Sequence, residues 1–229
     1  MPISEADKIA VVIPAYNEEK AIGAVVQRLL GEHPHLKVVV VDDGSRDGTW
    51  QVLNTLPIYR LRHLINMGQG AALQTGISFA AKLPVDYIVT FDADGQHRPS
   101  DMPRFIDALR DGGFAIAIGS RFLNAADVAN IPAKRRTLLR LATIFTRVTT
   151  GLKLTDTHNG YRAFRTSAAP ALEMRINGMA HASEILENIA RSRLPWTEVP
   201  VTIDYTEYSK AKGQKASNMI NIIWELIRR

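Results

Sequence analysis

Short, almost wholly apolar runs alternate with longer amphipathic stretches over the first 120 residues of the chain. The apolar runs are rich in Val and Ile, which is typical of strands, and lie at residues 9–13, 38–41, 87–91 and 114–118, with a weaker run near 58–61. The stretches between them predict helices over about 18–30, 49–55, 70–82 and 101–110. Strands that are apolar on both faces need cover on both faces. The pattern therefore predicts an α/β fold with a mostly parallel central sheet and helices on either side.

The second half of the chain is less regular. It predicts a basic amphipathic helix over 134–150, further helices over about 167–174 and 182–192, and a strand over 199–205. The last segment, 216–229, predicts an amphipathic helix with Met219, Ile222, Ile223, Leu226 and Ile227 on its apolar side. We interpret residues 1–229 as one domain whose character changes near residue 121.

Composition removes several classes of protein and site. Apolar residues make up 46% and charged residues 22% of the chain, which is ordinary globular usage. The sequence contains no Cys, which excludes disulfides, thiolate metal sites and a cysteine nucleophile. No run approaches the roughly 18 consecutive apolar residues of a membrane-spanning helix, and residues 1–8 lack the apolar region of a signal peptide. We therefore expect a cytoplasmic protein.

Charge is distributed unevenly along the chain. Residues 1–120 carry 11 Lys and Arg against 14 Asp and Glu, whereas residues 121–229 carry 17 against 9. A basic second half predicts an anionic partner: a nucleic acid, a phosphorylated substrate or an acidic membrane surface. Aromatic residues are only 7% of the chain, and polar segments of the first half are acidic, so a nucleic-acid-binding module is the weaker alternative.

Acidic and small residues gather where the predicted strands end. In parallel α/β sheets the ligand crevice lies beyond the carboxyl ends of the strands. There, Asp92-Ala93-Asp94 places two carboxylates on one side of an extended segment. Two such groups repel each other unless a cation lies between them, and hard oxygen ligands suit Mg²⁺ or Mn²⁺. We expect Asp92 and Asp94 to bind one of these ions, although a solvated acidic turn is the simpler alternative.

Two further motifs are candidates for substrate contacts. Asp42-Asp43-Gly44 follows the second strand, where adjacent carboxylates can accept hydrogen bonds from a ribose or a base, although a tight turn before a capped helix also explains it. The stretch from Asn66 to Gly70 is glycine-rich and opens a helix, so its N–H groups can approach a phosphate. Close packing of the helix explains these glycines equally well.

Cationic side chains of the second half are candidates to neutralise phosphates. They are Arg121, Arg162, Arg165, Lys210, Lys212 and Lys215, the last three in a basic loop around Gly213. The six histidines have no metal-ligand spacing. We expect His97, His158 and His181 to be structural or to support other groups.

Taken in order, these motifs resemble those of inverting family 2 glycosyltransferases of GT-A fold, above all the branch that glycosylates dolichyl and other polyprenyl phosphates. The resemblance spans about residues 9 to 165. It rests on segments 11–19, 40–49, 66–72, 92–97, 119–121 and 156–162, which include Asp92-Ala93-Asp94-Gly95-Gln96-His97 and Asn159-Gly160-Tyr161-Arg162. The chain departs from many relatives of this branch in lacking C-terminal membrane helices.

The resemblance implies a role for each motif. Residues 1–120 would bind the nucleotide-sugar, with contacts from Pro14, Ala15, Tyr16, Asn17, Glu18, Asp42, Asp43 and Gly44. Asp92, Asp94 and Gln96 would hold the divalent metal, Mg²⁺ or Mn²⁺, on the diphosphate. Residues 121–215 would bind the acceptor. There Arg121, Asp156 and Arg162 would face the acceptor and the transferred sugar, and Lys210, Lys212 and Lys215 would lie over the diphosphate.

The resemblance also bears on the acceptor. Relatives that act on hydroxyl acceptors carry a Glu-Asp pair that supplies a catalytic base, and no such pair is found here. A polyprenyl phosphate is already ionised near neutral pH and needs no strong base. We therefore expect a polyprenyl phosphate acceptor, with a hydroxyl acceptor in glycan synthesis as the alternative. In that case Asp94, Asp156 and Glu184 are the candidate bases.

A lipid acceptor also predicts contact with a membrane. The helices at 134–150 and 216–229 combine apolar and cationic faces, which favour anionic lipid surfaces. We expect a peripheral protein on the inner face of the cell membrane. Packing of either helix on the core or on a second copy, in a homo-oligomer, is the alternative.

Two other functions are disfavoured. A sugar nucleotidyltransferase would carry Gly, Arg and Lys just after its first strand, and Pro14–Glu18 lacks them. An inactive homologue is disfavoured because the Asp92/Asp94 pair is intact.

Overall fold

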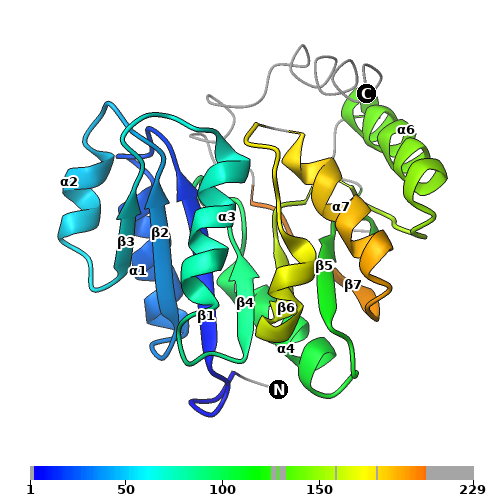
Figure 1. Cartoon of the computed structure of the whole chain (residues 1–229), viewed down its shortest axis with the longest axis horizontal. Helices are drawn as coiled ribbons and strands as arrows, with labels where there is room; N and C mark the ends of the chain where they lie inside the picture. The colour runs from blue at the N-terminus through cyan, green and yellow to red at the C-terminus, as the bar shows by residue number, and fades with distance from the viewer. Residues whose placement is uncertain (1–2, 125–127, 129–132, 158, 179, 205–229) are drawn as a thin grey trace.

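The computed structural model describes residues 3–124, 128, 133–157, 159–178 and 180–204. Its centre is a seven-stranded sheet in the order β3-β2-β1-β4-β6-β5-β7 (Figure 1). The strands are β1 (Ile9–Ala15), β2 (Lys37–Asp42), β3 (Tyr59–Arg62), β4 (Tyr87–Thr90), β5 (Ile116–Ser120), β6 (Arg162–Arg165) and β7 (Trp196–Pro200). All neighbouring pairs are parallel except those of β6, which runs antiparallel to both β4 and β5. The mostly parallel sheet is thus confirmed.

Helices cover both faces of the sheet (Figure 1). One face packs against α1 (Ile22–Glu32), α2 (Thr49–Asn54) and α4 (Met102–Arg110), and the other against α3 (Gln69–Ala80), η3 (Thr166–Leu172) and α7 (His181–Ser192). Strand β1 shows why both faces are apolar. Its Val11 belongs to the first hydrophobic cluster and its Val12 to the second, and neither is exposed. Each such side chain stabilises the fold by roughly 1.5–3 kcal/mol through burial.

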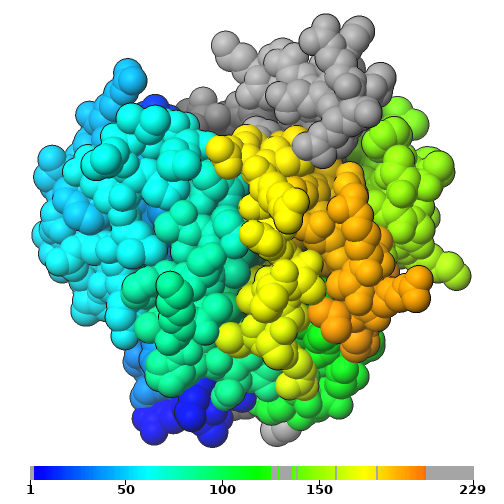
Figure 2. Space-filling view, in the orientation of Figure 1, coloured from blue at the N-terminus to red at the C-terminus, as the bar shows by residue number. Residues whose placement is uncertain are grey.

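Short one-turn elements and one long helix complete the described chain. The one-turn elements are η1 (Pro99–Asp101) and η2 (Arg121–Leu123). The long helix, α6 (Ala133–Thr150), lies on the outer surface of the molecule beside α7 (Figure 2). Leu139 and Thr143 of α6 are buried, whereas Leu141, Ile144 and Val148 are exposed. Within the residues described, no helix is long and apolar enough to cross a bilayer.

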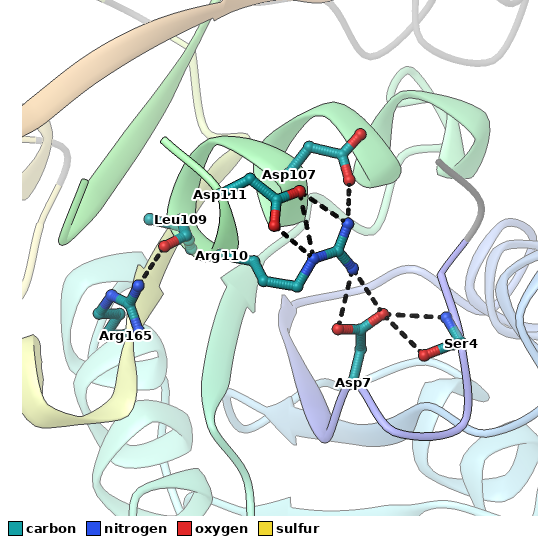
Figure 3. Close-up of polar contacts among 7 residues, drawn as sticks. All are labelled: Ser4, Asp7, Asp107, Leu109, Arg110, Asp111 and Arg165. Carbon is teal, nitrogen blue, oxygen red and sulfur yellow. Dashed lines mark hydrogen bonds and ion pairs between the residues drawn. The ribbon is translucent and has the colours of Figure 1, made fainter. Parts of the chain in front are cut away.

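An arginine at the end of α4 ties the N-terminal segment to the domain (Figure 3). Arg110 Nη1 donates to both carboxylate oxygens of Asp7 at 3.1 Å, and Arg110 also binds Asp107 and Asp111. Ser4 donates to Asp7 from its backbone and its hydroxyl. Burial alone would raise the pKa of Asp7, but these hydrogen bonds and the charge of Arg110 outweigh it and lower that pKa. The segment before β1 is therefore held by a charge network.

The structure differs from the sequence prediction mainly in the second half. The sequence did not predict strand β6, which is only four residues long and begins and ends with Arg. The predicted strand at 199–205 overlaps β7 only at its first two residues, since β7 begins at Trp196 and the chain then leaves the ladder. The tail helix at 216–229 lies outside the described residues.

Candidate functional site

Loops that follow strand ends meet at one edge of the sheet, as the sequence predicts. Pro14 and Ala15 pair with Val41 and Asp42 at the ends of β1 and β2. The next residues continue the contact, because the Asn17 N–H donates to Ser45 Oγ at 2.9 Å and the Glu18 N–H donates to Thr49 Oγ1 at 2.8 Å. The loop at 14–18 and the loop at 42–49 therefore form one surface.

Side chains on this surface differ in accessibility. Tyr16 is 38% exposed, whereas Ala15 and Glu18 are buried. Asn17 adopts a left-handed backbone with φ of 52°, and its side-chain oxygen accepts a hydrogen bond from the Arg46 N–H. The structure thus gathers the predicted nucleoside-binding residues, although their contact with a nucleoside stays a prediction.

The two carboxylates of the Asp42-Asp43 pair have different surroundings. Asp42 is fully buried, accepts a hydrogen bond from the Ser45 N–H at 3.0 Å and lies 3.0 Å from Arg62 Nε. Asp43 accepts from the Met67 N–H at 2.9 Å and the Gly68 N–H at 2.7 Å, and also contacts His63 at 2.7 Å. Asp43 therefore holds the loop before α3 in place, which is a role that the sequence did not predict.

Close packing against the backbone explains two of the glycines near this site, Gly44 and Gly70. A Cβ on Gly44, where φ is +68°, would lie 2.5 Å from the Ile65 carbonyl carbon, and a Cβ on Gly70 would lie 2.0 Å from the Ile176 oxygen. The Gly70 N–H donates to the Asn177 oxygen at 2.8 Å. Of the two explanations left open for the Asn66–Gly70 stretch, the structure therefore favours close packing at Gly70. Asn66 is exposed beside it.

The predicted metal-binding residues lie on one loop after β4. Asp92, Asp94 and Gln96 are all partly accessible, and Asp94 Oδ1 accepts a hydrogen bond from the Gln96 N–H at 3.0 Å. His97, by contrast, is 3% exposed and donates from Nε2 to Asp92 Oδ2 at 2.8 Å. Its ring packs against Tyr161, with centroids 5.0 Å apart. This geometry is consistent with the expected supporting role of His97, because the hydrogen bond orients the carboxylate of Asp92.

The two carboxylates have opposite pKa shifts. Burial would raise the pKa of Asp92, but the hydrogen bond and charge of His97, with the charges of Arg162 and His181, outweigh it and lower that pKa. Burial and the neighbouring charge of Asp92 raise the pKa of Asp94. The charge of Asp92 therefore disfavours ionisation of Asp94, and a cation bound between the two carboxylates would relieve that repulsion.

This donor set fits a hard divalent cation that also binds substrate. Among the described residues, no three or more His, Asp or Glu side chains are grouped so that they could hold a metal ion. Mg²⁺ and Mn²⁺ commonly use one or two carboxylates and complete their shell with water and phosphate oxygens. Asp92 and Asp94 can supply the carboxylates, and Gln96 an amide oxygen.

Strand β6 brings a buried cation beside Asp92. Arg162 is 2% exposed, and its Nε has no hydrogen-bond partner among the described residues. Burial lowers the pKa of Arg162 to about 10, while the charges of Asp92 and Asp156 oppose that shift. The side chain therefore stays cationic near neutral pH and links the two acidic groups electrostatically.

Arg121 and Asp156, which were both predicted to face the acceptor and the transferred sugar, form a buried ion pair. Arg121 Nε and Nη2 donate to the two oxygens of Asp156 at 2.6 and 2.7 Å, and Arg121 is 6% exposed. Arg165, the other candidate cation here, donates instead to the backbone oxygen of Leu109 (Figure 3) and to that of Phe114. Arg165 therefore supports the fold, and Lys210, Lys212 and Lys215 lie outside the described residues, as does His158.

Three contributors to the site were missed at the sequence level. Gly160 lies against Asp92, because a Cβ there would be 2.7 Å from both carboxylate oxygens. His63 links Asp43 to Thr75 of α3, with 2.9 Å between Nε2 and Oγ1. Glu198 of β7 binds the backbone before Asp156. Only Gly160 had a sequence signal, its place within the segment 156–162.

Comparison with known proteins matches this arrangement to one family. The family model described as glycosyl transferase family 2 matches residues 10–172, which include every strand end described above except that of β7. The chain belongs to glycosyl transferase family 2. This glycosyltransferase is 34% identical over 242 residues to a UDP-N-acetylglucosamine–dolichyl-phosphate N-acetylglucosaminyltransferase of Methanococcus voltae, covering 97% of this chain and 96% of that protein.

Two further proteins extend the comparison. The glycosyltransferase is 29% identical to an undecaprenyl-phosphate mannosyltransferase of Micrococcus luteus, over 97% of this chain and 96% of that protein. Its fold is similar to that of glucosyl-3-phosphoglycerate synthase from Mycobacterium tuberculosis in complex with Mn²⁺ and UDP-glucose. The TM-score is 0.71 at 18% identity, with 97% of this chain and 78% of the other covered. The expected GT-A fold is thereby confirmed.

Proposed function

We propose that this glycosyltransferase moves a sugar from a nucleotide-sugar donor to a polyprenyl phosphate, with Mg²⁺ or Mn²⁺ as cofactor. The observation that carries the proposal is the carboxylate pair Asp92 and Asp94 at the end of β4, with the buried cation Arg162 beside it. The named relatives act on dolichyl and undecaprenyl phosphates, and the structural neighbour binds Mn²⁺ with UDP-glucose.

Charge decides how these residues would act. Negative charge grows on the nucleoside diphosphate as the bond to the sugar breaks, and a bound divalent cation would withdraw part of that charge. Asp92 and Asp94 would hold the cation, with Gln96 as a further ligand. Arg162 would add a fixed positive charge in a buried position, where electrostatic interactions are stronger than in water. We assign Pro14–Glu18 and Asp42 to the nucleoside.

The surroundings of Asp156 and Glu184, two of the three candidate bases, favour a phosphate acceptor over a hydroxyl; the third, Asp94, would bind the metal. Both oxygens of Asp156 accept hydrogen bonds from Arg121. The Glu184 carboxylate accepts from the Arg175 and Ile176 N–H groups at 2.8–3.1 Å. The oxygen lone pairs used in these hydrogen bonds are not free to take a proton from a hydroxyl. An ionised lipid phosphate attacks without a base, so positioning by Arg121 and Arg162 would suffice.

A lipid acceptor also implies contact with a membrane. Leu141, Ile144, Phe145 and Val148 follow helical spacing on α6, and all are 44–80% exposed. The helix carries Lys134, Arg135, Arg136, Arg140 and Arg147 and no acidic residue. An apolar face on a cationic helix suits the interface of an anionic bilayer. We therefore place the enzyme as a peripheral protein on the inner, cytoplasmic face of the membrane.

One experiment tests donor, acceptor and metal together. Purified protein with Mn²⁺ or Mg²⁺ is incubated with a panel of nucleotide-sugars, with and without undecaprenyl phosphate, and release of the nucleoside diphosphate is measured. We expect release that depends on both the lipid and the metal, and its loss in Asp94→Asn. Full activity in chelator, or release that undecaprenyl phosphate does not stimulate, would contradict the proposal.

A further inference from the structure

Glu198 lies outside the segment that the family model covers. It nevertheless accepts a hydrogen bond from the backbone N–H of Asp156, a residue of the predicted acceptor site. It is on the edge strand β7, whose register with β5 places Glu198 beside Ile118 and Val199 beside Gly119. Glu198 therefore lies two residues before the end of β5, which ends at Ser120 and is followed by Arg121. The register alone makes Glu198 a neighbour of the predicted acceptor site.

The carboxylate of Glu198 is used entirely on one turn. Its two oxygens accept from the Thr155 N–H at 2.8 and 2.9 Å, from Thr155 Oγ1 at 2.9 Å and from the Asp156 N–H at 3.2 Å. Within the described part of the chain, no Lys, Arg or His forms an ion pair with it. Burial, with the nearby charge of Asp156, raises the pKa of Glu198.

That turn carries the partner of Arg121. Asp156 accepts from Arg121 Nε and Nη2, and also from the Arg121 N–H at 3.2 Å. Thr155 Oγ1 lies 2.6 Å from Ser120 Oγ, so the turn is bound to the end of β5 a second time. Glu198 thus fixes the turn, the turn fixes Asp156, and Asp156 fixes the guanidinium of Arg121.

We propose that Glu198 is a positioning residue for the acceptor, which through Thr155 and Asp156 sets where Arg121 presents its charge to the acceptor phosphate. The inference rests on the proposed function, since it concerns that phosphate. Placement of a catalytic-site cation within about 0.5 Å is what supporting hydrogen bonds provide.

Two substitutions separate position from charge. Glu198→Gln keeps the length of the side chain and one accepting oxygen, but removes the charge. Glu198→Asp keeps the charge but shortens the side chain by one methylene, which withdraws its oxygens by about 1.5 Å. Thr197→Ala is the matched control on the same strand, because among the described residues the Thr197 hydroxyl contacts only the backbone oxygen of Glu198, at 3.4 Å.

The readout is steady-state kinetics with the donor and undecaprenyl phosphate varied in turn. In Glu198→Asp we expect kcat/KM for the lipid to fall about ten- to hundredfold, because a displacement near 1 Å has that effect, while the KM of the donor is unchanged. Glu198→Gln should stay within about threefold of the wild type, since it retains an accepting oxygen at the same reach. Thr197→Ala should match the wild type.

Each other outcome has a definite meaning. Unchanged kinetics in Glu198→Asp, or a larger loss in Glu198→Gln than in Glu198→Asp, would overturn the positioning role. An equal loss toward donor and lipid, or the same loss in Thr197→Ala, would also overturn it, because it would indicate a general defect of β7. If the wild type transfers no sugar to the lipid from any donor, the proposed function fails first and the inference falls with it.

Discussion

Replacement of Gly160 by Ala tests the metal site without removing any ligand. A Cβ at this position would lie 2.7 Å from both carboxylate oxygens of Asp92 and 3.0 Å from its Cγ. Rotation of the carboxylate cannot relieve the overlap, because both oxygens are equally close. The Gly160 backbone cannot easily withdraw either, since its oxygen accepts a hydrogen bond from Thr90 Oγ1 at 2.6 Å. The Asp92 side chain must therefore move.

The size of that movement follows from contact distances. Ordinary contacts of a Cβ begin near 3.4 Å, so Asp92 must shift by about 0.7 Å. Metal–ligand distances tolerate only about 0.2 Å. We therefore expect Gly160→Ala to weaken Mn²⁺ binding by about ten- to hundredfold, which is the usual cost of disturbing the support of a ligand. The crowding should also lower the free energy of unfolding by about 1–3 kcal/mol.

Titration calorimetry with Mn²⁺ in the presence of a nucleoside diphosphate measures the affinity directly. Gly178→Ala is the matched control, because no atom of the described residues lies within 4 Å of a Cβ at that glycine. We expect the control to bind Mn²⁺ as the wild type does. Equal affinity in Gly160→Ala and the wild type, with the variant folded, would refute the assignment of Asp92 to the metal.

Three further predictions concern stability and the membrane. Because the folded-state pKa of Asp7 lies below its ordinary value of 3.8, its stabilising effect is present above that pH and is lost as the pH falls through the lowered pKa. The difference in melting temperature between the wild type and Asp7→Asn should therefore shrink below about pH 3.8. Exchange of Leu141 and Val148 for Gln should reduce co-sedimentation with anionic vesicles severalfold, because these side chains are 58% and 80% exposed. Gly76→Ala should lower the free energy of unfolding in urea by about 1–3 kcal/mol, because its Cβ would lie 2.3 Å from Val12 Cγ1.

Each of these has its own control. A difference in melting temperature that stays constant from pH 7 to pH 3 would contradict the role of the Asp7–Arg110 pair. Neutral vesicles serve as the comparison for the Gln variants, and unchanged sedimentation with anionic vesicles would favour packing of α6 on another protein surface. Gly31→Ala adds a Cβ that no atom in the described part of the chain approaches within 4 Å, so it should not destabilise the fold as Gly76→Ala does.

Local periodicity determined the first half of this protein. Val and Ile runs bury both faces of β1, β2 and β4, so strand positions and the parallel sheet follow from neighbouring residues alone. The carboxyl ends of such strands meet at one edge, which is why Asp92 and Asp94 could be assigned to a common site with the loop at 14–18. Local sequence also fixed the Asp94–Gln96 turn, whose hydrogen bond joins residues two apart.

Only the tertiary structure decided which partner each polar group has. The sequence of β6 is polar at both ends and buried because it lies between β4 and β5, a placement that no local pattern contains. Arg121 and Asp156 are 35 residues apart, and Asp156 and Glu198 are 42 apart. Hydrogen bonds of that separation depend on how the strands are ordered. For that reason the acidic and cationic residues could be named from the sequence. The series of hydrogen bonds that links Glu198 to Arg121, and the contact of Gly160 with Asp92, appeared only in the folded protein.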